Sequence, residues 1–207
     1  MELIKALNWR YATKKFDPSK KVKDEDFETL KEAVRLTATS YGLQAFKVKI
    51  ISDDATKQKI AFACSNQPQI TTAHHLFLFC NYTKVSATDV DNYLERISNT
   101  RSLDIEKVAP FGDYIKGALN GLEDEQLAAW TSKQTYIAMG TLLAAAGELK
   151  IDSCPMEGFD ADQLNQLLDL NDKHLNVSSI VAVGYRSEDD KNQHLKKVRK
   201  SKEELFI

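Results

Sequence analysis

Cysteine is scarce in this chain, which holds only three among its 207 residues. Cys64, Cys80 and Cys154 are widely separated, and no pair of them has the spacing of a zinc site. Cysteines that are so few, and odd in number, argue against a disulfide framework and favour a reducing cytoplasm. The histidines include the adjacent pair His74 and His75, whose side chains would point to opposite faces of a strand. We therefore expect no metal site.

Excess charge and long apolar runs are missing as well. The formal net charge is −2, whereas a nucleic-acid-binding domain normally carries a clear basic excess. We expect no signal peptide at the opening residues, MEL, because no basic segment precedes a long apolar core. The apolar run over 136–146 is much shorter than the roughly 20 residues that span a bilayer. We expect neither nucleic acid nor a membrane as a partner.

The familiar local motifs of enzymes are also absent. The sequence holds no phosphate-binding P-loop, no glycine fingerprint of a dinucleotide fold and no nucleophile elbow. No serine, histidine and aspartate form a local hydrolase pattern. Any chemistry must therefore come from a bound cofactor or from residues dispersed along the chain.

What the sequence does contain is one long helical segment, residues 123–150. Its first turn is acidic, which suits the positive end of a helix dipole, and no proline interrupts it. From Tyr136 to Ala146 it is apolar nearly all round, which predicts a buried helix. Small residues such as Gly140 and Ala144 would let other backbones approach closely. Two interpretations stay open: a central core helix, or a core helix that also forms a dimer interface.

The remaining patterns predict one α+β or α/β domain over residues 1–207. Alternation predicts a strand at 46–51, and continuous apolar runs predict buried strands at 75–80 and 178–185. Helices are predicted at 2–9, 24–36, 55–64, 88–98 and 161–168, with loops at 37–44, 65–69 and 151–160. Residues 101–120 contain Pro110 and Gly112, which predict a surface excursion that is helical only in pieces. The apolar end, 204–207, needs burial, as a last strand on this subunit or on a partner.

Two short basic clusters stand far apart in the sequence. Arg10 and Lys14 flank a loop after the first predicted helix, and Lys197 and Arg199 follow the last predicted strand. Arginine binds phosphate through two parallel hydrogen bonds and lysine binds it as a point charge. Clusters that meet in the fold could therefore hold one phosphate group. The alternative is that all four are solvated surface charges.

Two loops carry further candidate groups. Residues 39–44 offer small hydroxyl side chains and Gly42 just before a strand, which could hydrogen-bond a flat polar ligand. Residues 155–160 place a proline and a glycine around Glu157, so their backbone N–H groups could point outward. The alternatives are an ordinary turn for the first loop and, for the second, a turn that ends in the helix cap Asp160.

Taken together, these four motifs and the segment Asn66–Gln69 occur in the order found in the FMN-dependent nitroreductase family. Each motif alone is weakly or moderately specific, and PMEGFD at 155–160 is the most specific of them. The chain resembles the oxygen-insensitive NAD(P)H nitroreductase and dihydropteridine reductase branch over nearly its whole length. The five motifs lie at Arg10–Lys14, Ser40–Gln44, Asn66–Gln69, Pro155–Asp160 and Lys197–Arg199.

The resemblance implies an α+β, nitroreductase-like fold: a central mixed β-sheet surrounded by helices, with a C-terminal strand exchanged with the dimer partner. It implies a homodimer that holds two FMN molecules at the subunit interface, with NADH or NADPH as reductant. Hydride would pass through flavin N5 to nitroaromatics, quinones or similar small acceptors in a ping-pong cycle. Three alternatives stay open: a flavin, dihydropteridine or quinone reductase with incidental nitroreduction, a non-catalytic FMN-binding protein, and a helical interaction domain without cofactor.

The resemblance also assigns residues to the site. Lys14 and Glu157 would lie near flavin N5, and no side chain is assigned as a certain catalytic acid or base. Asn66 matches the family residue at the pyrimidine edge of the ring, with Gln67 as the alternative. The family often has Ser at Ala12 and Gln-Pro-Trp at 44–46, so one hydrogen bond and some loop rigidity would be missing here. The implied cofactor-binding residues are Arg10, Tyr11, Ala12, Lys14, Thr39, Ser40, Gln44, Asn66, Pro155, Met156, Glu157, Gly158, Lys197 and Arg199, and the implied substrate pocket holds Tyr41, Phe111 and Tyr114.

Overall fold

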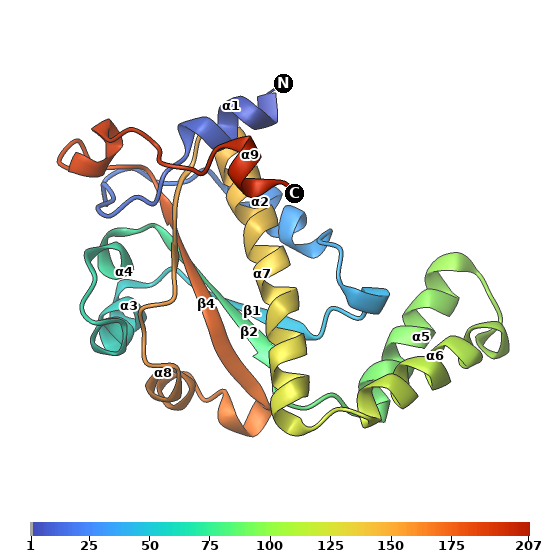
Figure 1. The fold of residues 1–207 in the computed structure, drawn as a ribbon. Coiled ribbons are helices and arrows are strands. Elements are labelled where there is room, and N and C mark those ends of the chain that lie inside the picture. The colour runs from blue at the N-terminus through green and yellow to red at the C-terminus, as the bar shows by residue number, and fades with distance from the viewer. Residues whose placement is uncertain (1) are drawn as a thin grey trace.

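A four-stranded antiparallel sheet forms the centre of the computed structural model, which describes residues 2–207 (Figure 1). Its strands are β1 (Phe46–Ile51), β2 (His75–Tyr82), β3 (Asp152–Met156) and β4 (Leu175–Gly184), in the order β1-β2-β4-β3. Val48 pairs with Phe79, Leu78 with Ile180, and Cys154 with Ala182. The central strands β2 and β4 are the continuous apolar runs of the sequence, as expected for strands covered on both faces.

The long helix α7 (Asp124–Glu148) covers one face of this sheet. Glu123 begins it with a capping box, in which Glu123 and Gln126 each bind the other's backbone N–H. Ala138, Leu142 and Ala146 are buried against the side chains of β2 and β4. The prediction that α7 is buried on all its faces is wrong for a single chain. Tyr136 and Ile137 keep 37% and 48% of their surface exposed, so one apolar face of α7 is open.

Helices cover both faces and make three layers. α1 (Glu2–Trp9) and α2 (Asp24–Arg35) pack on α7, while α3 (Asp54–Ala61), α4 (Pro68–Thr72) and α8 (Ala161–Leu167) cover the opposite face. Ile60, Ile70 and Leu164 carry that second layer into the core. Within residues 2–207 no helix is both long enough and apolar enough to cross a membrane. Four short 3₁₀ segments complete the chain: Ser40–Gly42, Phe62–Cys64, Asn171–Lys173 and Lys191–His194.

A helical hairpin projects from this body (Figure 1). It consists of α5 (Ala87–Arg101) and α6 (Ile105–Asn120), which we call the arm. The predicted break in the second helix is wrong, because α6 is continuous through Pro110. Proline in its second turn removes only one intrahelical hydrogen bond. Gly112 then lets α6 pack against Leu94 of α5, where a Cβ would lie 2.2 Å from the Leu94 Cδ1 atom.

Four other expectations differ from the structure. A mixed sheet was expected, but all strand pairs of the observed sheet are antiparallel. The one parallel bridge within residues 2–207 joins Ala12 to Ser153. The expected loop over 151–160 contains β3, whose edge position tolerates Pro155. The predicted loop at 65–69 runs into α4, with Pro68 in its first turn. The C-terminal segment is no strand in this chain but a single helical turn, α9 (Lys202–Leu205), and residues 206–207 are exposed.

Candidate functional site

The two basic clusters, 187 residues apart at their closest contact, meet around one cavity of about 480 Å³. Arg10, Lys14, Lys197 and Arg199 all line it, together with Lys196. Among the described residues that line the cavity there are five cations and no carboxylate. The four charges therefore converge on one cavity, although Lys14, Lys197 and Arg199 remain exposed to solvent. The other lining residues are Asn8, Trp9, Tyr11, Ala12, Pro155, Asn192, Gln193 and Leu195.

The N-terminal cluster is placed by the end of α1 and by the edge of the sheet. The Arg10 N–H still donates to the Ala6 carbonyl, at 2.9 Å, so Arg10 directly follows the last turn of α1. The chain then runs beside β3, where Ala12 bridges Ser153 and the Thr13 N–H donates to the Ser153 carbonyl at 3.4 Å. This path carries the side chains of residues 10–14 to the same end of β3 as Pro155.

The C-terminal cluster reaches the same cavity after β4. The Lys191–His194 segment turns the chain, and the Lys197 ammonium then donates to the Arg10 carbonyl. Desolvation lowers the pKa of Lys197, and the neighbouring Arg10 and Arg199 charges lower it further. Burial and Arg199 likewise lower the pKa of Arg10. Both groups therefore sit where positive charge is in excess.

One buried donor in this cavity has no partner within residues 2–207. It is Arg10 Nε, which is shielded from solvent and makes no hydrogen bond. A buried guanidinium donor left unpaired costs free energy, and an anionic oxygen would satisfy it. The residues present therefore fit an anionic group such as a phosphate, which arginine and lysine bind in the two ways described above.

Lys14 lies on the β3 side of the site and is exposed to solvent. Its ammonium is 3.7 Å from Cys154 Sγ, directly before Pro155. Burial raises the pKa of the Cys154 thiol in spite of this neighbouring cation, so the thiol stays protonated at neutral pH. Cys154 is therefore a neutral neighbour of Lys14 and not its counter-ion.

The loop after β3 is held by Gln67, which the sequence argument considered only as a flavin contact, and by Gln69. Gln67 Nε2 donates to the Gly158 carbonyl at 2.7 Å, and Gln69 donates to Gln67 Oε1 at 3.1 Å. Asn66 is exposed, with a φ of 51°, and its side chain makes no hydrogen bond in the described part of the chain. Gln67 thus has a structural partner already, while Asn66 is open to a ligand. Glu157 is also exposed, and burial together with Glu157 raises the pKa of Tyr136 on α7 to about 12.

The other predicted residues gather elsewhere in the single chain. Tyr41 meets Phe111 and Tyr114 edge to face, with ring centroids 6.5 and 6.0 Å apart. The three expected substrate-pocket residues are thus brought together at the arm. The Ser40 N–H donates to Gln134 of α7 at 2.8 Å, and Thr39 Oγ1 accepts from the Gln44 N–H. Thr39, Ser40 and Gln44 do not line the basic cavity of their own chain.

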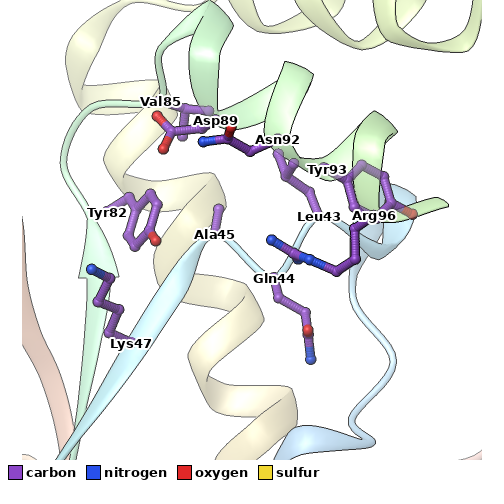
Figure 2. A pocket seen from close by; sticks show the side chains of 10 residues that line it. All are labelled: Leu43, Gln44, Ala45, Lys47, Tyr82, Val85, Asp89, Asn92, Tyr93 and Arg96. Atoms are coloured by element: carbon purple, nitrogen blue, oxygen red, sulfur yellow. The ribbon is translucent and has the colours of Figure 1, made fainter. Parts of the chain in front are cut away.

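Gln44 instead lines a second cavity, of about 270 Å³, between the arm and the sheet (Figure 2). Lys47 and Arg96 contribute cations there, but Asp89 contributes a carboxylate. Its charge is therefore more balanced than that of the basic cavity, and its volume is smaller. The basic cavity is the better candidate for a large anionic cofactor.

Comparison with known proteins agrees with this site and this fold. The model of the nitroreductase family matches residues 7–185. The major NAD(P)H-flavin oxidoreductase of Aliivibrio fischeri is 36% identical, with 99% of this chain and 97% of the relative aligned. YfkO of Bacillus subtilis, provisionally named an NAD(P)H nitroreductase, is 35% identical over 91% of this chain and 90% of its own length.

Solved structures with the same fold include YdfN of Bacillus subtilis, with a TM-score of 0.88, 18% identity and coverage of 100% of this chain and 97% of that one. An Exiguobacterium sibiricum protein provisionally named a nitroreductase, solved in complex with FMN, has a TM-score of 0.82 and 17% identity, covering 99% and 94% of the two chains. At such identities these structures support the fold alone. The family model and the sequence relatives carry the assignment: the chain belongs to the nitroreductase family and is an enzyme of the nitroreductase type.

Proposed function

We propose that this enzyme binds FMN in the basic cavity and transfers hydride from NADH or NADPH to nitroaromatics, quinones or similar small acceptors. The observation that carries the proposal is the cavity itself, where five cations, no lining carboxylate and the unpaired Arg10 Nε converge among the described residues. FMN supplies the reversible hydride chemistry when it is bound, so the protein needs only to hold and orient it.

The two clusters divide this binding task. Arg10, Lys197 and Arg199 hold the phosphate and the ribityl end, because their charges converge where Arg10 has a free donor. Lys14, which contacts Cys154 and lines the cavity together with Pro155, would approach the ring. A fixed cation beside the ring stabilises negative charge that develops during reduction.

The loop after β3 supports one face of the ring. Pro155 lines the cavity, and Gln67 holds the Gly158 carbonyl, so Met156, Glu157 and Gly158 follow in a fixed conformation. A bound flavin would have the backbone N–H of Glu157 or Gly158 near N5, and Asn66 would hold the pyrimidine edge of the ring. No protein side chain is required as acid or base, because solvent can deliver the protons.

A second copy of the chain completes the site. Thr39, Ser40 and Gln44 lie away from the basic cavity of their own chain, and the apolar face of α7 at Ile137 is open. We infer a homodimer in which residues 39–44 of one subunit reach the cofactor of the other. The exposed C-terminal segment 205–207 adds to the partner's sheet, and Tyr41, Phe111 and Tyr114 shape the acceptor pocket.

A second candidate function is flavin reduction, with free flavin, a dihydropteridine or a quinone as the acceptor and nitroreduction incidental. The relative from Aliivibrio fischeri, which is named a flavin oxidoreductase, favours this candidate. The two functions share the cofactor and the reductant and differ only in the oxidising substrate. Anaerobic reduction followed by addition of FMN, a quinone or a nitroaromatic compares their reoxidation rates directly.

The decisive experiment is a visible absorption spectrum of the purified protein before and after NADH or NADPH is added without oxygen. We expect a yellow protein that bleaches with at least one of the two reductants. A yellow protein that bleaches with neither would indicate FMN binding without this reductive half-reaction. A colourless protein that FMN does not reconstitute would contradict the assignment of Arg10, Lys14, Lys197 and Arg199.

A further inference from the structure

Asp190 lies where the two basic segments cross, and one of its oxygens serves three donors. Its Oδ2 accepts from the Lys14 N–H at 2.7 Å, the Lys15 N–H at 3.2 Å and the Tyr11 hydroxyl at 3.2 Å. The residue is only 3% exposed. A single carboxylate oxygen therefore fixes the backbone of the loop that carries Arg10 and Lys14 towards the cavity.

The other oxygen of Asp190 serves the second cluster. Its Oδ1 accepts from the Asn192 N–H at 3.0 Å and so caps the Lys191–His194 segment. That segment is the last regular turn before Lys197 and Arg199. One side chain thus ties the two chain segments whose cations line the cavity. A second, backbone contact reinforces the crossing, since the Ser187 N–H donates to the Lys15 carbonyl at 3.0 Å.

Asp190 does not itself line the cavity, so it is no ligand of whatever binds there. Its role is to hold other groups in place. Burial raises the pKa of Asp190, but the N–H groups of Lys14, Asn192 and Lys15 and the Tyr11 hydroxyl outweigh that effect and hold the pKa below its ordinary value. The carboxylate is therefore ionised at neutral pH and offsets part of the repulsion among the cations nearby.

The fold around Asp190 has a second anchor that does not depend on it. Asp152 accepts from the Arg186 N–H at 2.9 Å and from Arg186 Nε at 2.8 Å. The Arg186 guanidinium contacts the rings of Trp9 and Tyr11, at 4.5 and 4.6 Å from their centroids. Loss of the Asp190 side chain would thus leave the loop of residues 10–15 attached to the sheet. The distance between the two basic clusters would no longer be fixed.

We propose that Asp190 is a positioning residue that sets the distance between the two basic clusters, so that together they grip the phosphate of the cofactor. The inference rests on the proposed function and deepens it. It requires a specific pattern: loss of Asp190 weakens binding of the phosphorylated flavin FMN and leaves binding of riboflavin, which has no phosphate, nearly unchanged.

The experiment compares the wild-type protein with Asp190→Ala, Asp190→Asn and the control Asp189→Asn. Asp189 is the exposed neighbour, and its carboxylate pairs with Lys15 Nζ at 2.8 Å, outside the cavity lining. Flavin-free protein is titrated with FMN and with riboflavin by fluorescence quenching. Thermal unfolding of the flavin-free protein and turnover at saturating FMN are measured on the same samples.

We expect Asp190→Ala to raise the FMN dissociation constant by about tenfold or more, as for loss of hydrogen bonds to a charged group. Asp190→Asn, which keeps one acceptor oxygen, should restore part of the loss, and Asp189→Asn should bind FMN like the wild type. The riboflavin dissociation constant should change little. A general loss of structure would instead weaken both flavins alike.

Two results overturn the inference alone. In the first, neither Asp190→Ala nor Asp190→Asn changes the affinity for FMN. In the second, the better-folded of the two variants loses affinity for FMN and for riboflavin by the same factor. A wild-type protein that binds no FMN overturns the proposed function and the inference with it. The wild-type titration therefore distinguishes the two failures.

Discussion

Lys14 and Lys15 are neighbours in sequence with opposite surroundings. Lys14 Nζ lies inside the basic cavity near Cys154, whereas Lys15 Nζ forms an exposed ion pair with Asp189. We predict that Lys14→Ala weakens FMN binding by about 10- to 100-fold and slows turnover, since a hydrogen bond to a charged group contributes roughly 1.5–3 kcal/mol. Lys15→Ala removes the same charge outside the cavity and should bind FMN normally. Equal flavin content and rate in both variants would contradict the role of Lys14.

His75 makes stability depend on pH. It is 7% exposed and stacks on Phe27, with ring centroids 4.1 Å apart. Desolvation, then the neighbouring His74 and Lys57, lower the pKa of His75 from 6.5 to about 4. The unfolded chain therefore binds a proton at pH values where the folded chain does not, and stability falls as pH drops from 6.5 towards 4.

Replacing His75 with phenylalanine tests this dependence, because the stack on Phe27 remains while the titration disappears. We expect the free energy of unfolding to fall in both proteins when the pH is lowered from 7 to 4.5. The decrease should be larger in the wild type than in His75→Phe, by on the order of 2 kcal/mol. Urea unfolding at both pH values measures the difference. Equal slopes would show that His75 does not titrate in this range.

At the scale of elements, the arm depends on the close approach of α5 and α6. A Cβ at Gly112 would meet Leu94 Cδ1 at 2.2 Å, whereas nothing lies within 4 Å of a Cβ at Gly117 in the same helix. Alanine stabilises a helix by roughly 0.5–1 kcal/mol relative to glycine, while overpacking costs about 1–3 kcal/mol. We predict that Gly112→Ala loosens the arm and Gly117→Ala stabilises it. Hydrogen exchange of the α5 and α6 amides measures both, and equal protection would refute the packing argument.

The arm also shows what sequence patterns could not determine. The central strands and α7 were predicted because composition and period are properties of the segment itself. α6 was predicted in pieces because Pro110 and Gly112 are breakers in isolation, and only contact with Leu94 explains why a glycine is needed. β3 was taken for a loop because five residues with a proline form a strand only through pairing with β4. Both errors concern non-local contacts.

The candidate site likewise contains residues that the sequence could identify and others that it could not. Arg10, Lys14, Lys197 and Arg199 could be selected by residue type and by resemblance, and the structure brings them to one cavity. Asp190 could not be selected, because in sequence it ends an acidic run, Glu188 to Asp190, of ordinary surface character. Only its buried position against residues 11–15 sets it apart. Contacts of Thr39 and Ser40 with the cofactor stay predictions, since they would require a second chain.

At the scale of the whole molecule, several apolar surfaces remain open in the single chain. They include the face of α7 around Tyr136 and Ile137 and the C-terminal segment 205–207. Exposed apolar patches of this kind are typical of interfaces between subunits. A twofold dimer uses the same patch on both copies, and the small residues Gly140 and Ala144 on α7 would let two such helices approach closely.

We predict that the wild-type protein has about twice the chain mass of 23.3 kDa by light scattering, and that Ile137→Glu shifts it towards a single chain. A buried carboxylate without a partner strongly disfavours an apolar interface. FMN retention should fall in the same variant, because residues 39–44 of the second subunit are then lost from the site.

Phe62→Glu is the control, since Phe62 is 74% exposed and follows α3, on the face of the sheet opposite α7. An Ile137→Glu monomer with undiminished FMN affinity would show that one chain suffices to form the site, and an Ile137→Glu dimer would place the interface elsewhere.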